Sequence, residues 1–514
     1  MSNPSLDELP IRIGTPAEFA CVRSFFGGIQ FNDRAVCAAL KIRDIAGSRN
    51  LRPGEIDWDS VSPALRLAIT LFVLGASAPR EDFRKICGDE IFAAFTALGL
   101  VRDMRRCDAT IVCPVWLYPV DGFILASDRR DDPDGEEYRP PADVVFPGLD
   151  AGTLRLLRLL PQMRGGDALD LCGGCGIGAL HLSRTAERAV SADITRRSSF
   201  FAAFNAGLNG VNIESLEGDL YAPVMGRYFD VIAAHPPWVP STGDAIVFRD
   251  GGDGGETIIR RIVEGIPRYL HQGGTAIIVS LGRDTIEAPY ERRARGWLGE
   301  GGRDCDVILG IEKMLTIEEV VGSVRKLHLN DDHRQADRLA AHLRTLGTEK
   351  FIYGALFIRR TDELVAEPPL RLRMLSRAVA ADFDRLLAWR RQRRTTAFRD
   401  WMKLAKPRLA PDLEIVDRQV VRNGALVAGE TTMKAECAFS TSLRLDAWVI
   451  PMIASFKGSH SVEQVFSKAR RGSQSPGDFT LRAFIDLVAM MIEYGFLDVD
   501  ISEIQRPPRG AAKC

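Results

Sequence analysis

Leu169-Asp-Leu-Cys-Gly-Gly-Cys-Gly-Ile-Gly178 is an apolar strand that runs into a glycine-rich turn, and a helical pattern, Ala179-Leu-His-Leu-Ser183, follows it. In an open α/β sheet such a turn lies at the carboxyl end of the first strand. Glycines there let the backbone approach a ligand that side chains would exclude. Gly174 and Gly176 are the best candidates for this close approach. The turn does not identify the ligand, because NAD- and FAD-binding proteins use a similar one.

The sequence around this turn alternates apolar strands with helical patterns from about residue 140 to 360. The expected strands are Ala168–Leu171, Arg188–Asp193, Phe229–Ala234, Gly274–Ser280, Cys305–Gly310 and Phe351–Ile358. Strands that alternate with helices form βαβ units. The pattern therefore predicts an α/β fold with a Rossmann-like, doubly wound and mostly parallel sheet, flanked by helical N- and C-terminal domains.

The length of 514 residues is too great for one hydrophobic core, so two or three domains are expected. Residues 1–130 combine helical runs with strand-like segments in the outline of a winged-helix-like domain, and the polar stretch Asp128–Glu137 reads as a linker. The predicted domains are 1–130, an α/β domain over 131–362, and a helical domain over 363–514 that has some winged-helix-like features.

The composition excludes several classes of protein. A net charge of −1 gives no global attraction to nucleic acid or to an anionic membrane. No apolar stretch reaches the roughly 18 residues of a membrane span, and the start of the chain has no apolar signal segment, so a cytoplasmic protein is expected. The dispersed histidines and cysteines match no metal-ligand spacing, and we expect no catalytic metal. The run Arg390–Arg394 is either a solvated helix face or a nucleic-acid contact.

Three carboxylates follow the expected strand ends. Asp193 ends the second strand, where a carboxylate can accept hydrogen bonds from both ribose hydroxyls of a nucleoside. Asp219, in Glu217-Gly-Asp-Leu220, could accept a hydrogen bond from an adenine amino group. Asp170 ends the first strand and is placed to meet a cationic group of the same ligand.

The segment Phe229-Asp-Val-Ile-Ala-Ala-His-Pro-Pro-Trp238 separates this chain from NAD dehydrogenases, which have no need of such a turn. Two prolines fix the backbone, so the flanking carbonyls and the aromatic ring are held rigidly. Transfer of an activated methyl group requires mainly that the acceptor is oriented and water excluded. A rigid turn with an aromatic platform suits that task.

Over residues 140–360 the chain resembles class I methyltransferases with an Asn/Asp-Pro-Pro-aromatic motif, the group that includes protein-glutamine, adenine-N6 and rRNA-guanine methyltransferases. Phe248–Glu256 is similar to the Tyr-Arg-Asp-Gly-Gly segment of an actinobacterial subgroup, whose N-terminal module also looks like residues 1–130. The resemblance implies S-adenosylmethionine as cofactor. It implies cofactor-binding roles for Asp170, Cys172, Gly174, Gly176, Asp193, Ile194, Asp219, Leu220 and His235, and a catalytic acceptor site formed by His235, Pro236, Pro237 and Trp238.

The chain departs from the family pattern at two positions. Cys172 stands where the first loop glycine is usual, which is tolerable if its φ is negative. His235 replaces the Asn or Asp whose carbonyl oxygen accepts a hydrogen bond from the acceptor NH₂. An imidazole can accept, donate or act as a base, depending on its tautomer and protonation.

Three functions are compatible with these residues. We favour methyl transfer to a nitrogen or oxygen of a small molecule, because the net charge is near zero and the family's Asn is missing. The first alternative is a protein (glutamine N5) or RNA methyltransferase whose end domains are recognition modules. The second is an inactive nucleoside-binding regulator, against which the retained carboxylates and glycines argue. The oligomeric state is not predicted.

Overall fold

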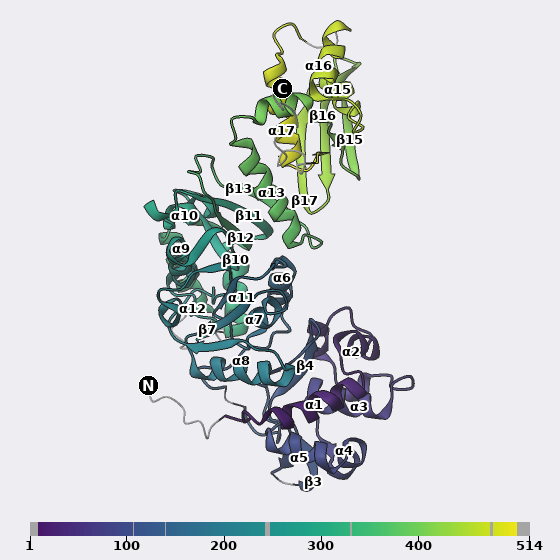
Figure 1. The fold of residues 1–514 in the computed structure, drawn as a ribbon, viewed down its shortest axis with the longest axis vertical. Coiled ribbons are helices and arrows are strands. Elements are labelled where there is room, and N and C mark those ends of the chain that lie inside the picture. The colour runs from purple at the N-terminus through teal and green to yellow at the C-terminus, as the bar shows by residue number, and fades with distance from the viewer. Residues whose placement is uncertain are drawn as a thin grey trace, which may run out of the picture. The chain divides into compact units, whose positions relative to one another are not determined.

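A computed structural model describes residues 9–105, 107–138, 140–241, 247–328, 332–472 and 476–500 (Figure 1). The chain divides into two compact units. The first contains residues 1–307 and 313–369, and the second contains residues 308–312 and 370–514. The three predicted domains remain a prediction, since the first unit combines the expected N-terminal module with most of the α/β region.

The N-terminal part of the first unit is a set of short helices around an aromatic core, in which the rings of Phe26, Phe72 and Phe95 pack at centroid distances near 5.5 Å. Its helices are α1 (Pro16–Gly28), α2 (Asp33–Leu40), η2 (Ile45–Asn50), η3 (Pro53–Glu55), α3 (Pro63–Ala68), η4 (Ile69–Val73), α4 (Arg80–Cys87) and α5 (Asp89–Ala97). Its strands are β1 (Ala78–Pro79), β2 (Arg102–Met104), β3 (Cys107–Val112), β4 (Trp116–Val120) and β5 (Phe123–Ser127). The first three form an antiparallel sheet in the order β1-β3-β2, and β4 pairs with β5 as a separate hairpin.

The sheet of the first unit has the strand order β12-β10-β9-β6-β7-β8. These strands are β6 (Asp167–Leu171), β7 (Arg188–Asp193), β8 (Glu214–Glu217), β9 (Phe229–Ala234), β10 (Leu270–Thr285) and β12 (Thr348–Arg360). Neighbours from β8 to β10 are parallel, and β12 is antiparallel to β10. The predicted mostly parallel, doubly wound sheet is confirmed.

Helices cover both faces of this sheet (Figure 1): α6 (Ala151–Leu159), α7 (Ile177–Leu182) and α8 (Arg196–Asn209) lie on one face, and α9 (Thr257–Tyr269) and α10 (Tyr290–Trp297) on the other. Short η5 (Ala222–Val224), η6 (Asp253–Gly255) and η7 (Glu300–Gly302) interrupt the loops. Between β11 (Cys305–Leu315) and β12 the chain inserts a helical hairpin, α11 (Ile317–His328) and α12 (His333–Thr345).

The N-terminal part is anchored on α8. The rings of Phe19 and Phe204 meet edge to face at 5.3 Å, and Arg23 donates to the Gly207 carbonyl at 2.7 Å. The buried side chain of Asn205 bonds both the N–H and the C=O of Ala126 on β5. Because α8 follows β7, this packing fixes the helix that leads out of the predicted nucleoside-binding edge.

The second unit combines helices with an antiparallel sheet. Its helices are α13 (Ala380–Arg393), α14 (Phe398–Leu404), η8 (Ala447–Val449), α15 (Ile450–Ala454), α16 (Val462–Arg471) and α17 (Leu481–Glu493). Its strands are β13 (Leu370–Met374), β14 (Arg408–Leu409), β15 (Leu413–Arg422), β16 (Ala425–Glu436), β17 (Phe439–Leu445) and β18 (Leu497–Asp498). The sequence patterns had indicated helices here and missed the strands β15 to β17.

The run Arg390–Arg394 lies at the end of α13. Arg390 is buried and forms an ion pair with the buried Glu493 at 3.1 Å, and Arg393 pairs with the same carboxylate. The interpretation of this run as a solvated helix face is therefore wrong for Arg390, because that guanidinium neutralises a core carboxylate.

Candidate functional site

The carboxyl ends of β6, β7 and β9 lie side by side, and they bring the predicted site residues to one edge of the sheet. Asp170 on β6 is in register with Ser191 on β7 and with Ala233 on β9. The loops that follow these strands carry the glycine turn, Asp193 and the His235 turn. Ligands of open α/β sheets bind at this edge.

The glycine turn is shaped by positive backbone angles. Gly174 and Gly176 have φ of +54° and +82°, and Gly176 is the residue from which α7 starts. A Cβ added at Gly174 would meet no atom within 4 Å, so this face of the loop is open to a ligand. Cys172 has φ of +56°. The condition under which a cysteine is readily tolerated at this position, a negative φ, is not met, and a non-glycine residue here costs roughly 1–2 kcal/mol.

Asp193 links the end of β7 to the glycine turn. Its carboxylate accepts hydrogen bonds from the Gly174 N–H at 3.0 Å and the Thr195 N–H at 3.1 Å. Burial raises the pKa of this carboxyl, whereas the two backbone donors oppose that shift. Ile194, next in the chain, is 54% exposed and free to contact a planar ring. The geometry of Asp193 fits an anchor for ribose hydroxyls. This role, and the cofactor contact expected of Ile194, stay predictions.

Asp170 is buried beneath the turn. One carboxylate oxygen accepts from the Ala179 N–H at 3.0 Å, and a Cβ added at Gly178 would meet the carboxyl at 2.6 Å. Burial raises the pKa of Asp170 to about 7, and the charge of Asp193 adds to the shift. A cation would favour the ionised form. The residue therefore fits the predicted partner of the cationic methionine end of S-adenosylmethionine.

Asp219 follows β8 and is half exposed. It forms an ion pair of 2.7 Å with Arg261 on α9, a residue that sequence reasoning did not single out. One of its oxygens is engaged in this pair. Leu220 beside it has φ of +50°, so the chain turns sharply at this point. The predicted adenine contacts of Asp219 and Leu220 remain predictions.

His235 ends β9 at the start of the Pro236-Pro237 turn. A Cβ added at Gly152 of α6 would lie 2.8 Å from both the His235 Nε2 and the Tyr353 hydroxyl, so the three groups converge. The imidazole makes no hydrogen bond within the described part of the chain. Burial lowers the pKa of His235 below its usual 6.5, with the charge of Asp150 opposing the shift. The ring is therefore neutral at pH 7.

Trp238 has packing partners as well as a place at the turn. Its ring meets that of Tyr353 on β12 at a centroid distance of 6.3 Å with a T-shaped geometry. It also packs against an apolar cluster that includes Val239 and the inward faces of α11 and α12. The helical hairpin α11–α12 therefore packs against the turn that contains Trp238. Neither Tyr353 nor Gly152 was predicted, because each is distant in sequence from every recognised motif.

The glycine-rich segment Phe248–Glu256 lies directly against this turn. Gly251 donates its N–H to the Val239 carbonyl at 2.8 Å, and Val239 donates to Arg249 at 2.9 Å. A Cβ at Gly251 would lie 2.8 Å from the Trp238 Cα, and one at Gly255 would lie 2.5 Å from the Trp238 carbonyl oxygen. Glycine is required at both positions because the backbone of this segment lies in contact with the backbone of Trp238.

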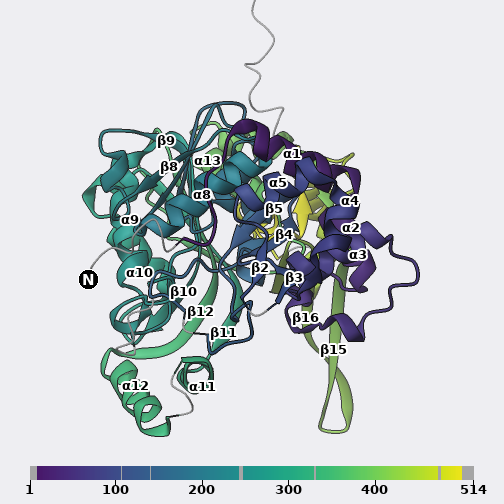
Figure 2. The ribbon, with the colours of Figure 1, turned by 90° about the horizontal axis from the view of Figure 1, so that it is seen from below.

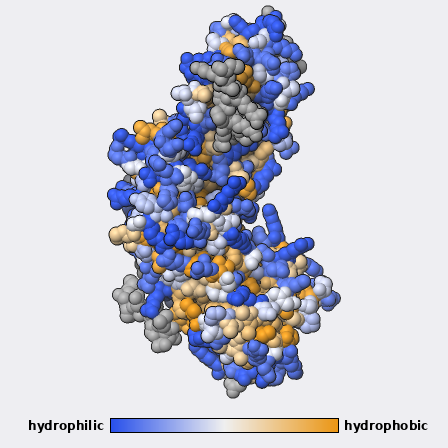
Figure 3. Space-filling view, in the orientation of Figure 1, coloured by the Kyte–Doolittle hydropathy of each residue, from blue (hydrophilic) through white to orange (hydrophobic). Residues whose placement is uncertain are grey.

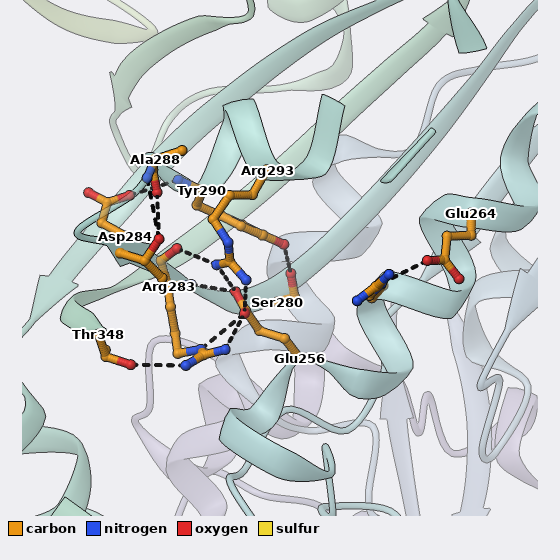
Figure 4. A network of polar contacts seen from close by, with 11 residues as sticks. Glu256, Glu264, Ser280, Arg283, Asp284, Ala288, Tyr290, Arg293 and Thr348 are labelled. Carbon is orange, nitrogen blue, oxygen red and sulfur yellow. Dashed lines mark hydrogen bonds and ion pairs between the residues drawn. The ribbon is translucent and has the colours of Figure 1, made fainter. Parts of the chain in front are cut away.

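The end of this segment is fixed by a buried ion cluster (Figure 4). Glu256 accepts from Arg283 at 3.0 Å and from Arg293 at 2.6 Å, and Arg283 also donates to Thr348 on β12 at 2.9 Å. The carboxylate is 4% exposed. The segment is thus tied to β10, α10 and β12. From the sequence, Glu256 was named only as the end of this segment, and Arg283, Arg293 and Thr348 were not singled out.

Within the described ranges, no group of three or more His, Cys, Asp or Glu side chains is placed to hold a metal ion. No helix of these ranges is long and apolar enough to cross a membrane.

Comparisons with known proteins place most of this region in a family. The model of the "Methyltransferase small domain" family matches residues 145–289. A Methanocaldococcus jannaschii protein, provisionally named a protein N5-glutamine methyltransferase, is 32% identical over 28% of this chain and 72% of its own length. The ribosomal protein uL3 glutamine methyltransferase of Bradyrhizobium diazoefficiens is 30% identical over 25% of this chain. A 16S rRNA N2-G1207 methyltransferase from T. Thermophilus, solved with AdoMet and guanosine, is 18% identical over 43% of this chain and 58% of its own, with a TM-score of 0.25.

The matched region includes the glycine turn, the three carboxylates and the His235 turn. The chain spans 46% of the length of the uL3 enzyme and 44% of a release factor glutamine methyltransferase from Xylella fastidiosa, which is 31% identical. The match to the Methanocaldococcus jannaschii protein covers most of that relative. The chain therefore belongs to the class I S-adenosylmethionine-dependent methyltransferases that share the methyltransferase small domain.

Proposed function

We propose that this enzyme methylates the side-chain amide nitrogen of a glutamine in a protein. The relatives named above act on protein glutamine or on rRNA by their names, and they favour a macromolecular acceptor over the small molecule that the sequence favoured. A carboxamide NH₂ is planar and weakly nucleophilic, so it needs a hydrogen-bond acceptor that orients it.

The observation that carries the proposal is the state of His235. The imidazole is neutral, largely buried and without a hydrogen bond among the described residues, at the turn that faces the cofactor edge. A ring nitrogen that no described residue engages is left for a substrate group to bond. A neutral ring nitrogen can accept an N–H, as the amide oxygen of the family's Asn does.

Bound S-adenosylmethionine supplies a methyl group activated by its sulfonium. His235 accepts one N–H of the acceptor amide and holds the nitrogen lone pair toward the methyl carbon. His235 would take the proton that the amide nitrogen loses when it receives the methyl group. Trp238 and Tyr353 enclose the reacting group and exclude water.

The test is to incubate the enzyme with methyl-labelled S-adenosylmethionine and a fractionated extract of its own cells. We expect label in protein, resistant to ribonuclease and recovered as N5-methylglutamine after enzymatic digestion. Label recovered in RNA or in a small metabolite would overturn the proposal.

On the identified acceptor, His235→Ala should lower turnover by roughly 10²- to 10⁴-fold with little change in cofactor affinity. His235→Asn restores the family's amide and should retain most of the activity. Because burial lowers the His235 pKa, the rate of the native enzyme should already be level at pH 7. Near-normal turnover of His235→Ala would show that the residue is only structural.

A further inference from the structure

The net charge of −1 conceals a strong asymmetry along the chain. Residues 1–369 contain 43 Lys and Arg against 52 Asp and Glu, a net charge of −9, whereas residues 370–514 contain 24 against 16, a net charge of +8. The division coincides with the start of the main part of the second unit at residue 370. Such an asymmetry is typical of chains in which one part binds a polyanion such as a nucleic acid.

We propose that this second unit is an RNA-binding module and that its hairpin β15–β16 contacts the RNA backbone. The proposal goes beyond the acceptor chemistry and does not depend on which group is methylated. It concerns what the enzyme is bound to while the methyl transfer takes place.

The β15–β16 hairpin projects from the rest of the second unit. Figure 2 shows β15 and β16 extending as a two-stranded finger. At its base the side chains of Met433 and Ala435 enter the hydrophobic core of the unit, and the Lys434–Glu414 ion pair lies on the opposite face. Residues 421–425, at the tip, are exposed.

Two arginines lie near the tip of this finger. Arg418 and Arg422 are exposed and form no ion pair with any described residue, and Val421 between them is 68% exposed. Four residues along a strand span roughly 13 Å, so the two guanidinium groups can contact separate phosphates. Exposed guanidinium groups without an acidic partner can contact phosphates and can stack their planes on the unpaired bases of single-stranded RNA.

Other basic side chains of the unit also have no acidic partner among the described residues. Lys468 and Arg471, in the last turn of α16, are exposed and have no acidic partner in the described ranges. In Figure 3 the described surface of this unit is largely hydrophilic. Lys468 and Arg471 present their charges to solvent, in contrast to Arg390, which is buried in an ion pair with Glu493.

RNA is favoured over duplex DNA by the burial of α17. A helix-turn-helix protein places its second helix in the major groove, so that helix has to be exposed. Here α17 follows α16 and buries Phe484, Ile485, Val488, Ala489, Met491, Ile492 and Glu493, and the face that it leaves exposed carries Arg482 and Asp486, whose charges cancel. Backbone and shape recognition by a protruding strand pair does not need a recognition helix.

The experiment measures binding of the full chain to a fluorescent 30-nucleotide single-stranded RNA of mixed sequence, without S-adenosylmethionine. Arg418→Gln/Arg422→Gln should weaken binding about tenfold at 0.1 M salt and reduce the slope of log affinity against log salt by about 1 to 2. Arg418→Lys/Arg422→Lys keeps the charges and should retain most of the affinity. The matched control Lys41→Gln/Lys403→Gln removes two surface lysines that are paired with Asp57 and Asp400, and should change little.

The same titration is run with DNA of the same sequence, with duplex DNA and with anionic phospholipid vesicles. Absence of RNA binding, equal loss in the hairpin and control variants, or tighter binding to duplex DNA or vesicles than to RNA would each overturn the proposal. His235→Ala should bind RNA normally. A failure of the proposed glutamine chemistry would thus leave the RNA titration unaffected, and the two proposals can fail separately.

Discussion

Asp170 is a buried carboxyl that the cofactor is expected to ionise. Its pKa is about 7 in the free protein, so below pH 7 it is mostly protonated. The methionine ammonium favours the carboxylate, and binding below this pH must release a proton. We expect the affinity for S-adenosylmethionine to rise with pH from 5.5 and to level off above 7.5. Calorimetry in buffers of different ionisation enthalpy measures both the affinity and the released proton.

The matched variant Asp170→Asn should bind more weakly and with little dependence on pH. The stability of the free protein changes in the opposite sense. The folded pKa is above the unfolded value near 3.9, so burial of Asp170 lowers stability progressively as pH rises from 4 to 7. A cofactor affinity that is flat across pH 5.5–7.5 in the native protein would contradict the assigned contact.

Individual site residues could be predicted from the sequence where they lie in a local motif. The carboxylates Asp170 and Asp193 are recognisable because each ends an apolar strand, and parallel strands bring their carboxyl ends together. Tyr353 could not be found this way. It lies on an antiparallel strand that begins more than 100 residues after His235, and only the register of β10 with β12 brings it to the site. The positive φ of Cys172 was also beyond the sequence, which shows a residue type but no backbone angle.

The segment Phe248–Glu256 depends on one carboxylate. Glu256 is buried between Arg283 and Arg293, so Glu256→Gln removes the charge that compensates two guanidinium groups. Breaking a buried ion pair by removing one partner costs about 3–5 kcal/mol. We expect a loss of that size in the free energy of unfolding of the first unit, measured by urea denaturation, together with lower activity.

Glu264→Gln is the control for this change. Its carboxylate pairs with Arg260 one turn away on α9, and these two side chains are 42% and 61% exposed. Figure 4 shows Glu264 apart from the cluster around Glu256. Such i,i+4 pairs contribute roughly 0.3–0.5 kcal/mol. Equal effects of the two substitutions would show that the cluster around Glu256 contributes no more than a surface pair.

At the scale of elements, sequence patterns predicted the strands that are buried and missed those that are exposed. The strands β6, β7 and β9 are continuous apolar runs, which are typical of a parallel sheet covered on both faces. In β15 most residues are exposed on both sides, so alternation of apolar and polar residues is absent. Its charged residues then read as a loop or a helix surface, and the finger was missed.

For the whole molecule, net charge hides how the charge is distributed along the chain. A chain with +8 on one part and −9 on the other has almost no net charge, so the value of −1 indicates only that there is no global attraction to nucleic acid. The field near each part depends on its own charge, because salt screens charges over about 8–10 Å. Charge has to be counted for each compact unit before partners are excluded.

The division into units also predicts where the chain can be cut. Residues 308–311 of β11 pair with β13, and both segments belong to the second unit. A fragment that ends at residue 369 lacks β13 and leaves this edge of β11 unpaired, whereas a fragment that ends at residue 378 retains it. An unpaired apolar edge promotes aggregation, and the arginines of β13, Arg371 and Arg373, are the kind of charged residues that protect an edge.

We therefore expect the fragment 1–378 to be monodisperse by size-exclusion chromatography and the fragment 1–369 to aggregate. Every predicted cofactor residue lies between Asp170 and His235, so 1–378 should bind S-adenosylmethionine with the affinity of the full chain. It lacks the β15–β16 finger and should have lost RNA binding. Loss of cofactor binding in a well-folded 1–378 would mean that the second unit completes the site. Retained RNA binding would place the RNA surface in the acidic part of the chain.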